Sequence, residues 1–436
     1  MRSDDTIFAT ASGHGRAAVC IIRISGPQSL TILETLGGRV PEPRHAAVRI
    51  LREPASGESL DQALVLWMPG PRSFTGEDQA ELHIHGGLAT RAAVLKALGA
   101  IAGCRPAEAG EFTRRAFLNG RMDLSQVEGL ADVIDAETEA QRRQAMLQLE
   151  GRLGNAAERW REGILQALAL LEASLDFSDE GDVPEDLEVD ILSRLDHLHA
   201  EIEQALSNRG GERLREGFTV VLAGPPNAGK STLLNALARR DVAIVSPIAG
   251  TTRDVIEVHC DLGGLPVVIV DTAGLRESRD VIEQEGVSRA RTRAQNADLV
   301  LWLIPPGGAE TGAPPARRLL KVGTKADLDR SRHDCDLFIS ASTGEGLPEL
   351  IAALEHEAET ALGEGDAILT RERHRKALER AHRSLTAGRE LLAARGPLEL
   401  AAEEVRLAAR AVGEITGRVD VEDVLDRLFS SFCIGK

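Results

Sequence analysis

The sequence predicts a multidomain chain in which an α/β domain is inserted into a helical domain that follows an α+β domain. Three observations predict this organisation. Short apolar runs alternate with Gly and Pro near the N-terminus, helical periodicity fills two separate stretches, and strand-like apolar runs between those stretches end in polar loops. The expected division is 1–118 for the α+β domain, 119–214 and 369–436 for the helical domain, and 215–368 for the insertion.

Each part is predicted from its own pattern. The N-terminal domain has strand-like runs at 19–24, 63–67 and 80–84 and a helix-like segment at 89–101. Apolar residues then recur at three-to-four spacing from 123 to 214, and this helical periodicity returns from 371 to 428. An insertion is tolerated where its two ends lie close together, so we expect the two helical stretches to pack as one bundle.

The inserted domain opens with a phosphate-binding loop. Residues 224–231 read Gly-Pro-Pro-Asn-Ala-Gly-Lys-Ser, between an apolar run at 218–223 and a helix-like Thr-Leu-Leu-Asn-Ala-Leu. The glycines let backbone N–H groups converge on phosphates, Lys230 reaches the β and γ oxygens, and the Ser231 hydroxyl ligates Mg²⁺. The expected nucleotide contacts in this segment also include Asn227, Ala228, Gly229 and Thr232.

Later motifs follow apolar runs, at the sheet edge where ligands bind. Thr252 is expected to be the second hydroxyl on the metal, Asp271 to hold the metal through water, and Gly274 to sense the γ-phosphate. Asp327 accepts two hydrogen bonds from guanine N1 and N2, which adenine does not offer, and so favours GTP over ATP. Thr324 stands where this motif usually has Asn, so we expect weaker affinity with unchanged specificity. The other expected nucleotide contacts are Ser246, Thr272, Ala273, Lys325, Ser340, Ala341 and Ser342.

The motifs also lack a familiar catalytic group. Leu275 follows Asp-Thr-Ala-Gly, where signalling GTPases carry a water-positioning Gln. The phosphate-binding loop has no arginine either, so the charge of the transition state must be neutralised in another way. The side-chain oxygen of Asn227, with backbone oxygens of 246–251, would hold a monovalent cation against the phosphates. The alternative is that Asn227 only stabilises the loop.

Composition limits the remaining possibilities. The chain has 436 residues and a formal net charge of −17, with a pI of about 5.2, so contact with nucleic acid must use a local patch or a partner's surface. Its five cysteines are odd in number and scattered, which favours a reducing cytoplasm over a disulfide framework. We find no secretory signal and no apolar stretch of membrane-spanning length. A soluble cytoplasmic protein is expected.

Four regions together resemble one family. They are the phosphate-binding loop with its companion motifs, the segment from 73 to 87, the segment from 110 to 119, and the C-terminal Phe-Cys-Ile-Gly-Lys at 432–436. The whole chain is similar to the MnmE (TrmE) family of bacterial tRNA-modifying GTPases. That resemblance implies an N-terminal folate-binding and dimerising domain, followed by a helical domain that carries a Ras-like P-loop GTPase domain as an insertion.

The resemblance also implies an activity and partners. Members of the family form homodimers and work with the flavoprotein MnmG in a heterotetrameric complex. They build aminomethyl-type groups, including carboxymethylaminomethyl, on C5 of the wobble uridine of certain tRNAs. The carbon comes from a 5-formyl- or methylene-tetrahydrofolate. The alternative class is a GTPase switch that binds RNA or assists ribosome assembly, although we find no KH-like or RNP-type module.

Several site residues are implied only by the resemblance. Glu283 would orient the attacking water when two GTPase domains meet. The metal ligands would be Asn227, Ser246, Ile248 and Thr251 for K⁺, and Ser231 and Thr252 for Mg²⁺. The folate site would use Arg23, Glu81, Arg121 and Lys436. The family commonly has Lys where this chain has Arg121, which keeps the charge but changes the geometry.

Two further features allow more than one interpretation. Cys433 lies four residues from the C-terminus, but Gly435 and Lys436 fit a prenylation box poorly. It is either a buried structural cysteine or an exposed thiol that takes part in the modification, which the resemblance favours. His83 and His85 are two apart on an expected strand near Glu81, which suggests either zinc or a packing role in the folate pocket.

Overall fold

The computed structural model describes residues 5–13, 15–176, 185–240, 242–244, 257–271, 297–307, 313, 316–329, 334–363, 367–419 and 422–435. The chain divides into two compact units, residues 1–131 with 413–436 and residues 132–412. The first unit is built from both ends of the chain. The second contains most of the helical stretches and the inserted α/β domain. The four-part division at 118, 214 and 368 stays a prediction.

The first unit contains a six-stranded sheet with the order β3-β4-β5-β2-β1-β6. Its strands are β1 (Thr6–Thr10), β2 (Ala17–Ser25), β3 (Ala47–Arg52), β4 (Ser59–Met68), β5 (Gln79–Gly86) and β6 (Cys104–Pro106). All neighbouring strands pair antiparallel except β1 and β6, which are parallel. The predicted runs at 19–24, 63–67 and 80–84 lie within β2, β4 and β5, so these three strands are confirmed.

Two helices, α1 (Ser29–Gly37) and α2 (Leu88–Gly99), pack on one face of this sheet. Successive strand residues point to opposite faces. Ile22 and Ile24 of β2 and Leu82 of β5 are buried against the helices, so Arg23 and Glu81 belong to the opposite face. The α+β prediction is confirmed, and the helix predicted at 89–101 is α2.

The described part of the first unit also contains two further helices and most of a third. They are α3 (Glu111–Leu118), α4 (Leu124–Asp135) and α14 (Glu422–Ser431). Val127 of α4 and Phe429 of α14 share one apolar cluster. The C-terminal end of the chain therefore packs on the helices that follow the N-terminal sheet.

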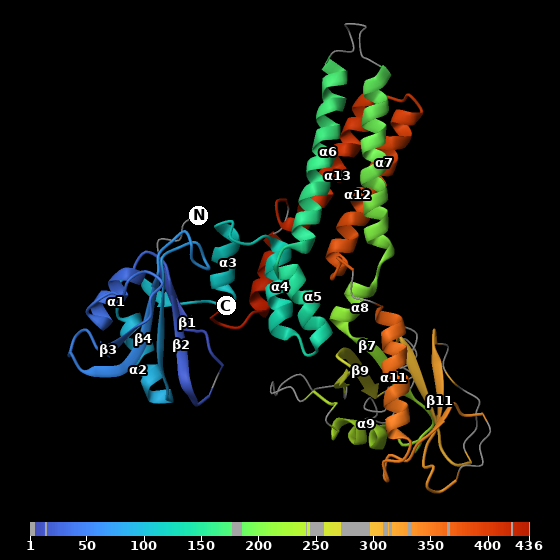
Figure 1. Cartoon of the computed structure of the whole chain (residues 1–436), viewed down its shortest axis with the longest axis horizontal. Helices are drawn as coiled ribbons and strands as arrows, with labels where there is room; N and C mark the ends of the chain where they lie inside the picture. The colour runs from blue at the N-terminus through green and yellow to red at the C-terminus, as the bar shows by residue number, and fades with distance from the viewer. Residues whose placement is uncertain are drawn as a thin grey trace, which may run out of the picture. The chain divides into compact units, whose positions relative to one another are not determined.

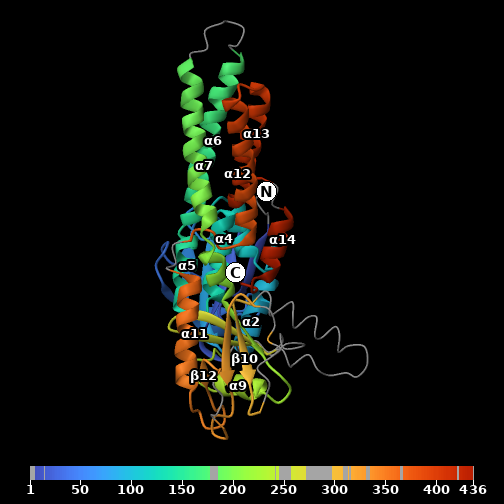
Figure 2. The ribbon, with the colours of Figure 1, turned by 90° about the vertical axis from the view of Figure 1, so that its right-hand side faces the viewer.

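The helical part of the second unit contains α5 (Glu139–Leu149), α6 (Arg152–Asp176), α7 (Glu185–Ser207), α8 (Gly210–Glu216), α12 (Glu372–Ala393) and α13 (Leu398–Thr416). The long helices α6, α7, α12 and α13 run side by side in both views (Figures 1 and 2). Their apolar positions, such as Ile164, Leu195 and Leu378, are buried. The two helical stretches separated by the insertion therefore pack together, as the periodicity predicts. No described helix is long and apolar enough to cross a membrane.

The inserted domain is a sheet with the order β12-β11-β10-β7-β9-β8. Its elements are β7 (Phe218–Ala223), α9 (Lys230–Ala238), β8 (Glu257–Leu262), β9 (Leu265–Asp271), β10 (Leu299–Ile304), β11 (Leu319–Gly323), β12 (Leu337–Phe338) and α11 (Leu347–Leu362). Only β8 and β9 pair antiparallel. Because β7 lies between β9 and β10, the loop after β7 opens at the switch point, where doubly wound sheets bind ligands.

Candidate functional site

The phosphate-binding loop joins the end of β7 at Ala223 to the start of α9 at Lys230. Gly224 has a φ of +152°, and a Cβ there would lie 2.6 Å from the Leu303 carbonyl oxygen, so only glycine fits beside β10. Gly229 caps α9 with a φ of 96°. Asn227 is exposed and has a left-handed φ of 61°. The loop has the sharp turn and the helix N-terminus that phosphate binding requires.

Lys230 lies against this loop. Its ammonium donates hydrogen bonds to the carbonyl oxygens of Gly224 at 2.9 Å and Pro225 at 3.1 Å. These bonds hold the positive charge beside the backbone that would receive the phosphates. Thr232, in the first turn of α9, is exposed.

Two of the expected metal-binding residues meet at the same edge of the sheet. The Ser231 hydroxyl donates a hydrogen bond of 2.8 Å to a carboxylate oxygen of Asp271, which ends β9 and is fully buried. Oxygen ligands from a helix start and a strand end are what Mg²⁺ prefers beside phosphates. The two residues therefore fit the magnesium role that the sequence suggested.

The base-recognition loops follow β11 and β12. The Thr324 hydroxyl donates a 2.8 Å hydrogen bond to the Ala228 carbonyl oxygen in the phosphate-binding loop, so Thr324 does contact that loop in place of Asn. The carboxylate of Asp327 is exposed. The Ala326 amide donates to the Ile339 carbonyl oxygen at 3.0 Å, which joins this motif to the next one.

The loop at 340–342 is stabilised by a hydrogen bond between two of its own hydroxyl groups. Ser340 and Ser342 lie 3.0 Å apart through their hydroxyl oxygens, and Ser340 is fully buried. Ala341 lies between them, partly buried against the core of the domain. The 324–327 and 340–342 segments are therefore adjacent loops at the carboxyl edge of the parallel strands.

Several expected site residues lie outside the described part of the chain. They are Ser246, Ile248, Thr251, Thr252, Thr272, Ala273, Gly274, Glu283 and Lys436. Their roles remain predictions, and of the proposed potassium ligands only Asn227 is described.

A second site occupies the sheet face opposite α1 and α2. Arg23 and Glu81 stand directly across from each other on β2 and β5 and form an ion pair of 3.3 Å. Glu81 also contacts a ring nitrogen of His83 at 3.1 Å. The Arg23 guanidinium lies over the rings of Phe74 and Phe112, 5.3 and 5.9 Å from their centroids. A cation, a carboxylate and aromatic rings thus meet on one face.

The two histidines do not share a site. His85 contacts Asp61, with 2.7 Å between the ring nitrogen and a carboxylate oxygen, whereas His83 contacts Glu81. Each imidazole has its own carboxylate partner. This arrangement favours the packing and pocket role over zinc.

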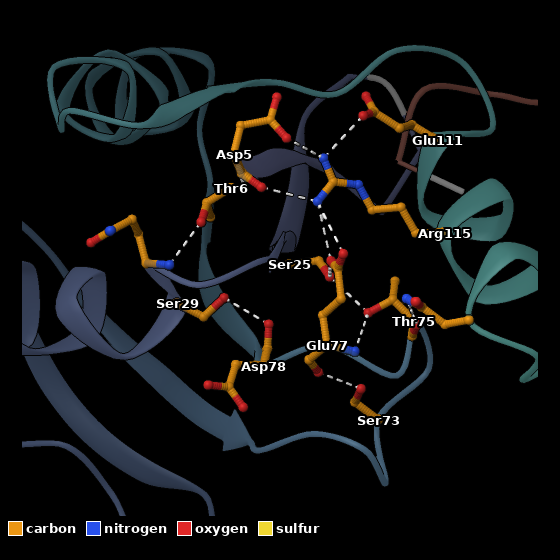
Figure 3. A network of polar contacts seen from close by, with 12 residues as sticks. Asp5, Thr6, Ser25, Ser29, Ser73, Thr75, Glu77, Asp78, Glu111 and Arg115 are labelled. Carbon is orange, nitrogen blue, oxygen red and sulfur yellow. Dashed lines mark hydrogen bonds and ion pairs between the residues drawn. The ribbon is translucent and has the colours of Figure 1, made fainter. Parts of the chain in front are cut away.

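The loop at 73–78 beside this face is held by a buried arginine (Figure 3). Arg115 of α3 donates to a carboxylate oxygen of Asp5 at 2.7 Å, of Glu77 at 3.1 Å and of Glu111 at 3.2 Å. The Ser25 hydroxyl also donates to Glu77 at 2.7 Å. The loop is thus tied to α3 and to the strands on either side.

Glu111 is ionised more readily than a free carboxyl. Burial raises the pKa of Glu111, but hydrogen bonds from Arg105, the Glu108 amide and Arg115 lower it by more, so the pKa lies below its ordinary value of 4.5. Glu111 is therefore ionised at neutral pH and can pair with both arginines.

Arg121 and the C-terminal tail approach the same unit. A Cβ at Gly76 would lie 3.3 Å from the Arg121 side chain, so the absence of a side chain leaves room for Arg121 over the loop. Ile434 forms a bridge with Ala109, and a Cβ at Gly435 would overlap the Thr10 carbonyl oxygen. The tail is therefore seated on the domain that carries Arg23 and Glu81.

The exposure of the cysteines separates Cys433 from the others. Cys20 and Cys260 are buried, Cys104 and Cys335 are half-buried, and Cys433 is exposed. Burial raises the pKa of Cys260 to about 11, which leaves that thiol protonated and unreactive. Of the two interpretations of Cys433, its exposure excludes a buried structural cysteine and agrees with the exposed thiol that the resemblance favours.

Sequence reasoning did not assign roles to Phe74, Phe112 and Arg115. All three occur in segments that carry the family resemblance, but a single aromatic or basic residue has no periodic signal. A buried arginine is identified only by its partners, which come from positions 5, 77 and 111.

Parallel strands, a phosphate-binding loop at their switch point and a buried aspartate facing the loop's serine define the class of P-loop GTPases. Comparison with protein families narrows this class to one family. The MnmE helical domain matches residues 124–433, and the N-terminus of GTP-binding protein TrmE matches residues 6–121. The chain belongs to the MnmE family of tRNA modification GTPases.

Individual relatives match along their whole length. The tRNA modification GTPase MnmE of Methylobacterium sp. (strain 4-46) is 61% identical over 99% of this chain and 100% of its own. The tRNA modification GTPase MnmE of Methylorubrum populi is 59% identical over 99% of this chain and 98% of its own. Among solved structures, the G domain of the T. maritima FeoB iron transporter has 23% identity and a TM-score of 0.24, over 32% of this chain and 98% of that chain.

Proposed function

We propose that this GTPase is potassium-dependent and, with a flavoprotein partner, forms an aminomethyl-type group at C5 of the wobble uridine of certain tRNAs. The seating of the C-terminal tail on the N-terminal domain carries this proposal. Ile434 pairs with Ala109, so an exposed thiol at Cys433 belongs to the same unit as the Arg23 and Glu81 pair. An exposed thiol in the same unit as a candidate folate site suits one-carbon transfer, not a simple nucleotide switch.

The nucleotide is bound by groups at the carboxyl edge of the sheet. Lys230 and the loop amides hold the phosphates, and Asp327 accepts from the guanine base. The Ser231 hydroxyl would ligate Mg²⁺ directly and Asp271, whose carboxylate oxygen lies 2.8 Å from it, would hold the ion through water. When bound, it neutralises charge on the β- and γ-phosphates.

The potassium role rests on Asn227 and on the sequence. The exposed, left-handed Asn227 is a candidate ligand beside the phosphates. The other candidates are Ser246, Ile248 and Thr251, and the hydrolytic glutamate is Glu283. K⁺ would supply the positive charge that an arginine provides in other GTPases.

The folate role is consistent with the face that carries Arg23 and Glu81. Their side chains are 21% and 18% exposed, so both remain open to a ligand. A pteridine ring presents adjacent N–H donors, from which a carboxylate can accept two hydrogen bonds, and its flat faces suit Phe74 and Phe112. Arg121, and Lys436 from the tail, would bind the anionic glutamate end.

The partners follow from charge and chemistry. A net charge of −17 gives no general attraction for tRNA. Binding through a partner's surface agrees with a heterotetramer of two copies of this chain and two of the flavoprotein MnmG. The redox step belongs to the flavin.

Steady-state GTP hydrolysis tests the cation and the glutamate. We expect faster turnover in K⁺ than in Na⁺ at equal ionic strength, and loss of this difference in Asn227→Ala. Glu283→Ala should bind GTP normally but lose roughly 100-fold or more of the K⁺-stimulated rate, as expected for loss of a water-orienting group. Equal rates in both salts at dimer-forming concentrations would refute the cation role, and normal turnover of Glu283→Ala would refute the glutamate's role.

A further inference from the structure

The helical bundle contains a cluster of ligand-type side chains away from both sites. His199 and Glu203 are one helical turn apart on α7, and His382 belongs to α12. Residues four apart lie on the same helix face. The helices α7 and α12 run side by side (Figures 1 and 2). Two imidazoles and a carboxylate therefore converge between two helices.

The distances suit a single bound ion. One nitrogen from each imidazole and one carboxylate oxygen of Glu203 all lie within 4.8 Å of one another. The two rings are 4.0 Å apart between centroids and tilted by 33°. Small side-chain rotations would bring the three atoms to the roughly 2 Å ligand distances of a transition metal.

The hydrogen-bonding state of the rings also favours a ligand. His382 Nε2 is buried and has no hydrogen-bond partner among the described residues. Such buried polar atoms are uncommon and usually have a missing partner. Apolar packing of two rings gives no reason for that nitrogen to be buried alone.

The partner of His199 sets its tautomer. The Thr386 hydroxyl donates to the His382 carbonyl oxygen at 2.8 Å, so its oxygen accepts from His199 Nε2 at 3.0 Å. The ring then carries its free lone pair on Nδ1. Such a bond from the other ring nitrogen is a common feature of metal-binding histidines.

The charge state agrees with this arrangement. Burial, and then the neighbouring His382, lower the pKa of His199. The ring is therefore neutral at physiological pH, as metal ligation requires.

We propose that His199, Glu203 and His382 form a binding site for a divalent transition metal such as Zn²⁺. Two imidazoles and one carboxylate are a known zinc ligand set, which leaves a fourth position for water. Glu203 is exposed, so the ion has a route from solvent.

The site would join the two helices that flank the inserted domain. The chain passes from α7 through α8 into β7, and it returns from α11 into α12. A metal held by both helices would cross-link α7 to α12. It would thereby stabilise the bundle from which the inserted GTPase domain extends.

The test uses the full chain, stripped with chelator and then loaded with GDP and excess Mg²⁺. Zn²⁺ is titrated in competition with a chromophoric chelator. A matched control is His197→Ala, which removes an equivalent His–Glu pair on α7. His197 is exposed and lies 3.0 Å from Glu201, and in the described part of the chain no second histidine completes a metal-type cluster with this pair.

We expect one tight Zn²⁺ per chain. His382→Ala should weaken it about 100-fold or more, because even indirect supports of a metal ligand change affinity by about 10- to 100-fold. Glu203→Gln, a substitution of similar size at an exposed position, should also weaken it. His197→Ala should leave the affinity unchanged. Zn²⁺ should raise the unfolding temperature of the wild type but not of the two site variants.

Two results would overturn the site. One is a wild-type affinity that neither His382→Ala nor Glu203→Gln changes. The other is a Co²⁺-loaded protein with the intense near-ultraviolet band of thiolate ligation, which would assign the metal to cysteines.

Discussion

Thr324 offers the most direct perturbation of the nucleotide site. Its hydroxyl donates to the Ala228 carbonyl oxygen at 2.8 Å, and the residue is only 4% exposed. The backbone amide of Thr324 separately donates to the Ile304 carbonyl oxygen at 2.9 Å. Thr324→Val therefore removes the side-chain bond to the phosphate-binding loop while the backbone stays in place.

One such bond contributes about 0.5–1.5 kcal/mol. If that energy orders the loop for binding, Thr324→Val should weaken GDP affinity about 2- to 13-fold. Thr324→Asn restores the residue usual in this motif and should tighten binding by a similar factor. Selectivity for guanine should not change in either variant, because it depends on Asp327.

The assay is titration with a fluorescent GDP analogue, followed by competition with GTP and ATP. Thr360→Val is the control, because the Thr360 hydroxyl makes a similar bond, 2.9 Å to the His356 carbonyl oxygen, on an exposed part of α11. Affinity for GDP should be highest in Thr324→Asn, intermediate in the wild type and lowest in Thr324→Val. Equal affinity of the Val variant and the wild type, or weaker binding by the Asn variant, would refute this account of Thr324.

The first unit allows two further predictions. The lowered pKa of Glu111 means that its ionised form stabilises the fold above its ordinary value of 4.5, and that this stabilisation is lost as the pH falls through the lowered value. Glu111→Gln should therefore unfold at a lower temperature than the wild type at pH 7, and this difference in unfolding temperature should become smaller toward pH 4. A difference that does not depend on pH would contradict this. Gly435 has a φ of 104° and no room for a Cβ beside Thr10. Strain of about 1–3 kcal/mol should make Gly435→Ala release the tail about 5- to 150-fold more often. Carboxypeptidase digestion should be faster by that factor, with Gly13→Ala, which has open space, digested at the wild-type rate.

Much of the nucleotide site could be predicted from the sequence because its chemistry is local. Residues 224–231 are contiguous, and parallel strands bring the later loops to the same edge. The apolar run at 267–270 predicts Asp271 at the end of a strand, where it lies, and its pairing with Ser231 follows from that topology. The contact from Thr324 to the loop was also expected and is present.

The N-terminal site was harder to predict because it depends on long-range pairing. Arg23 and Glu81 are 58 residues apart and meet only through the register of β2 and β5. The support of the 73–78 loop by Arg115 requires helix α3 to reach across to Asp5. The cluster on α7 and α12 has the same character, since no spacing in the sequence relates His199 to His382.

The most direct test of the central claim is the wobble-uridine content of total tRNA, measured by mass spectrometry after deletion of the gene in its host. The account predicts loss of a C5-aminomethyl-type uridine, restored by the intact gene but not by a Cys433→Ser copy. An unchanged nucleoside profile would contradict the account and would favour a GTPase that acts in ribosome assembly.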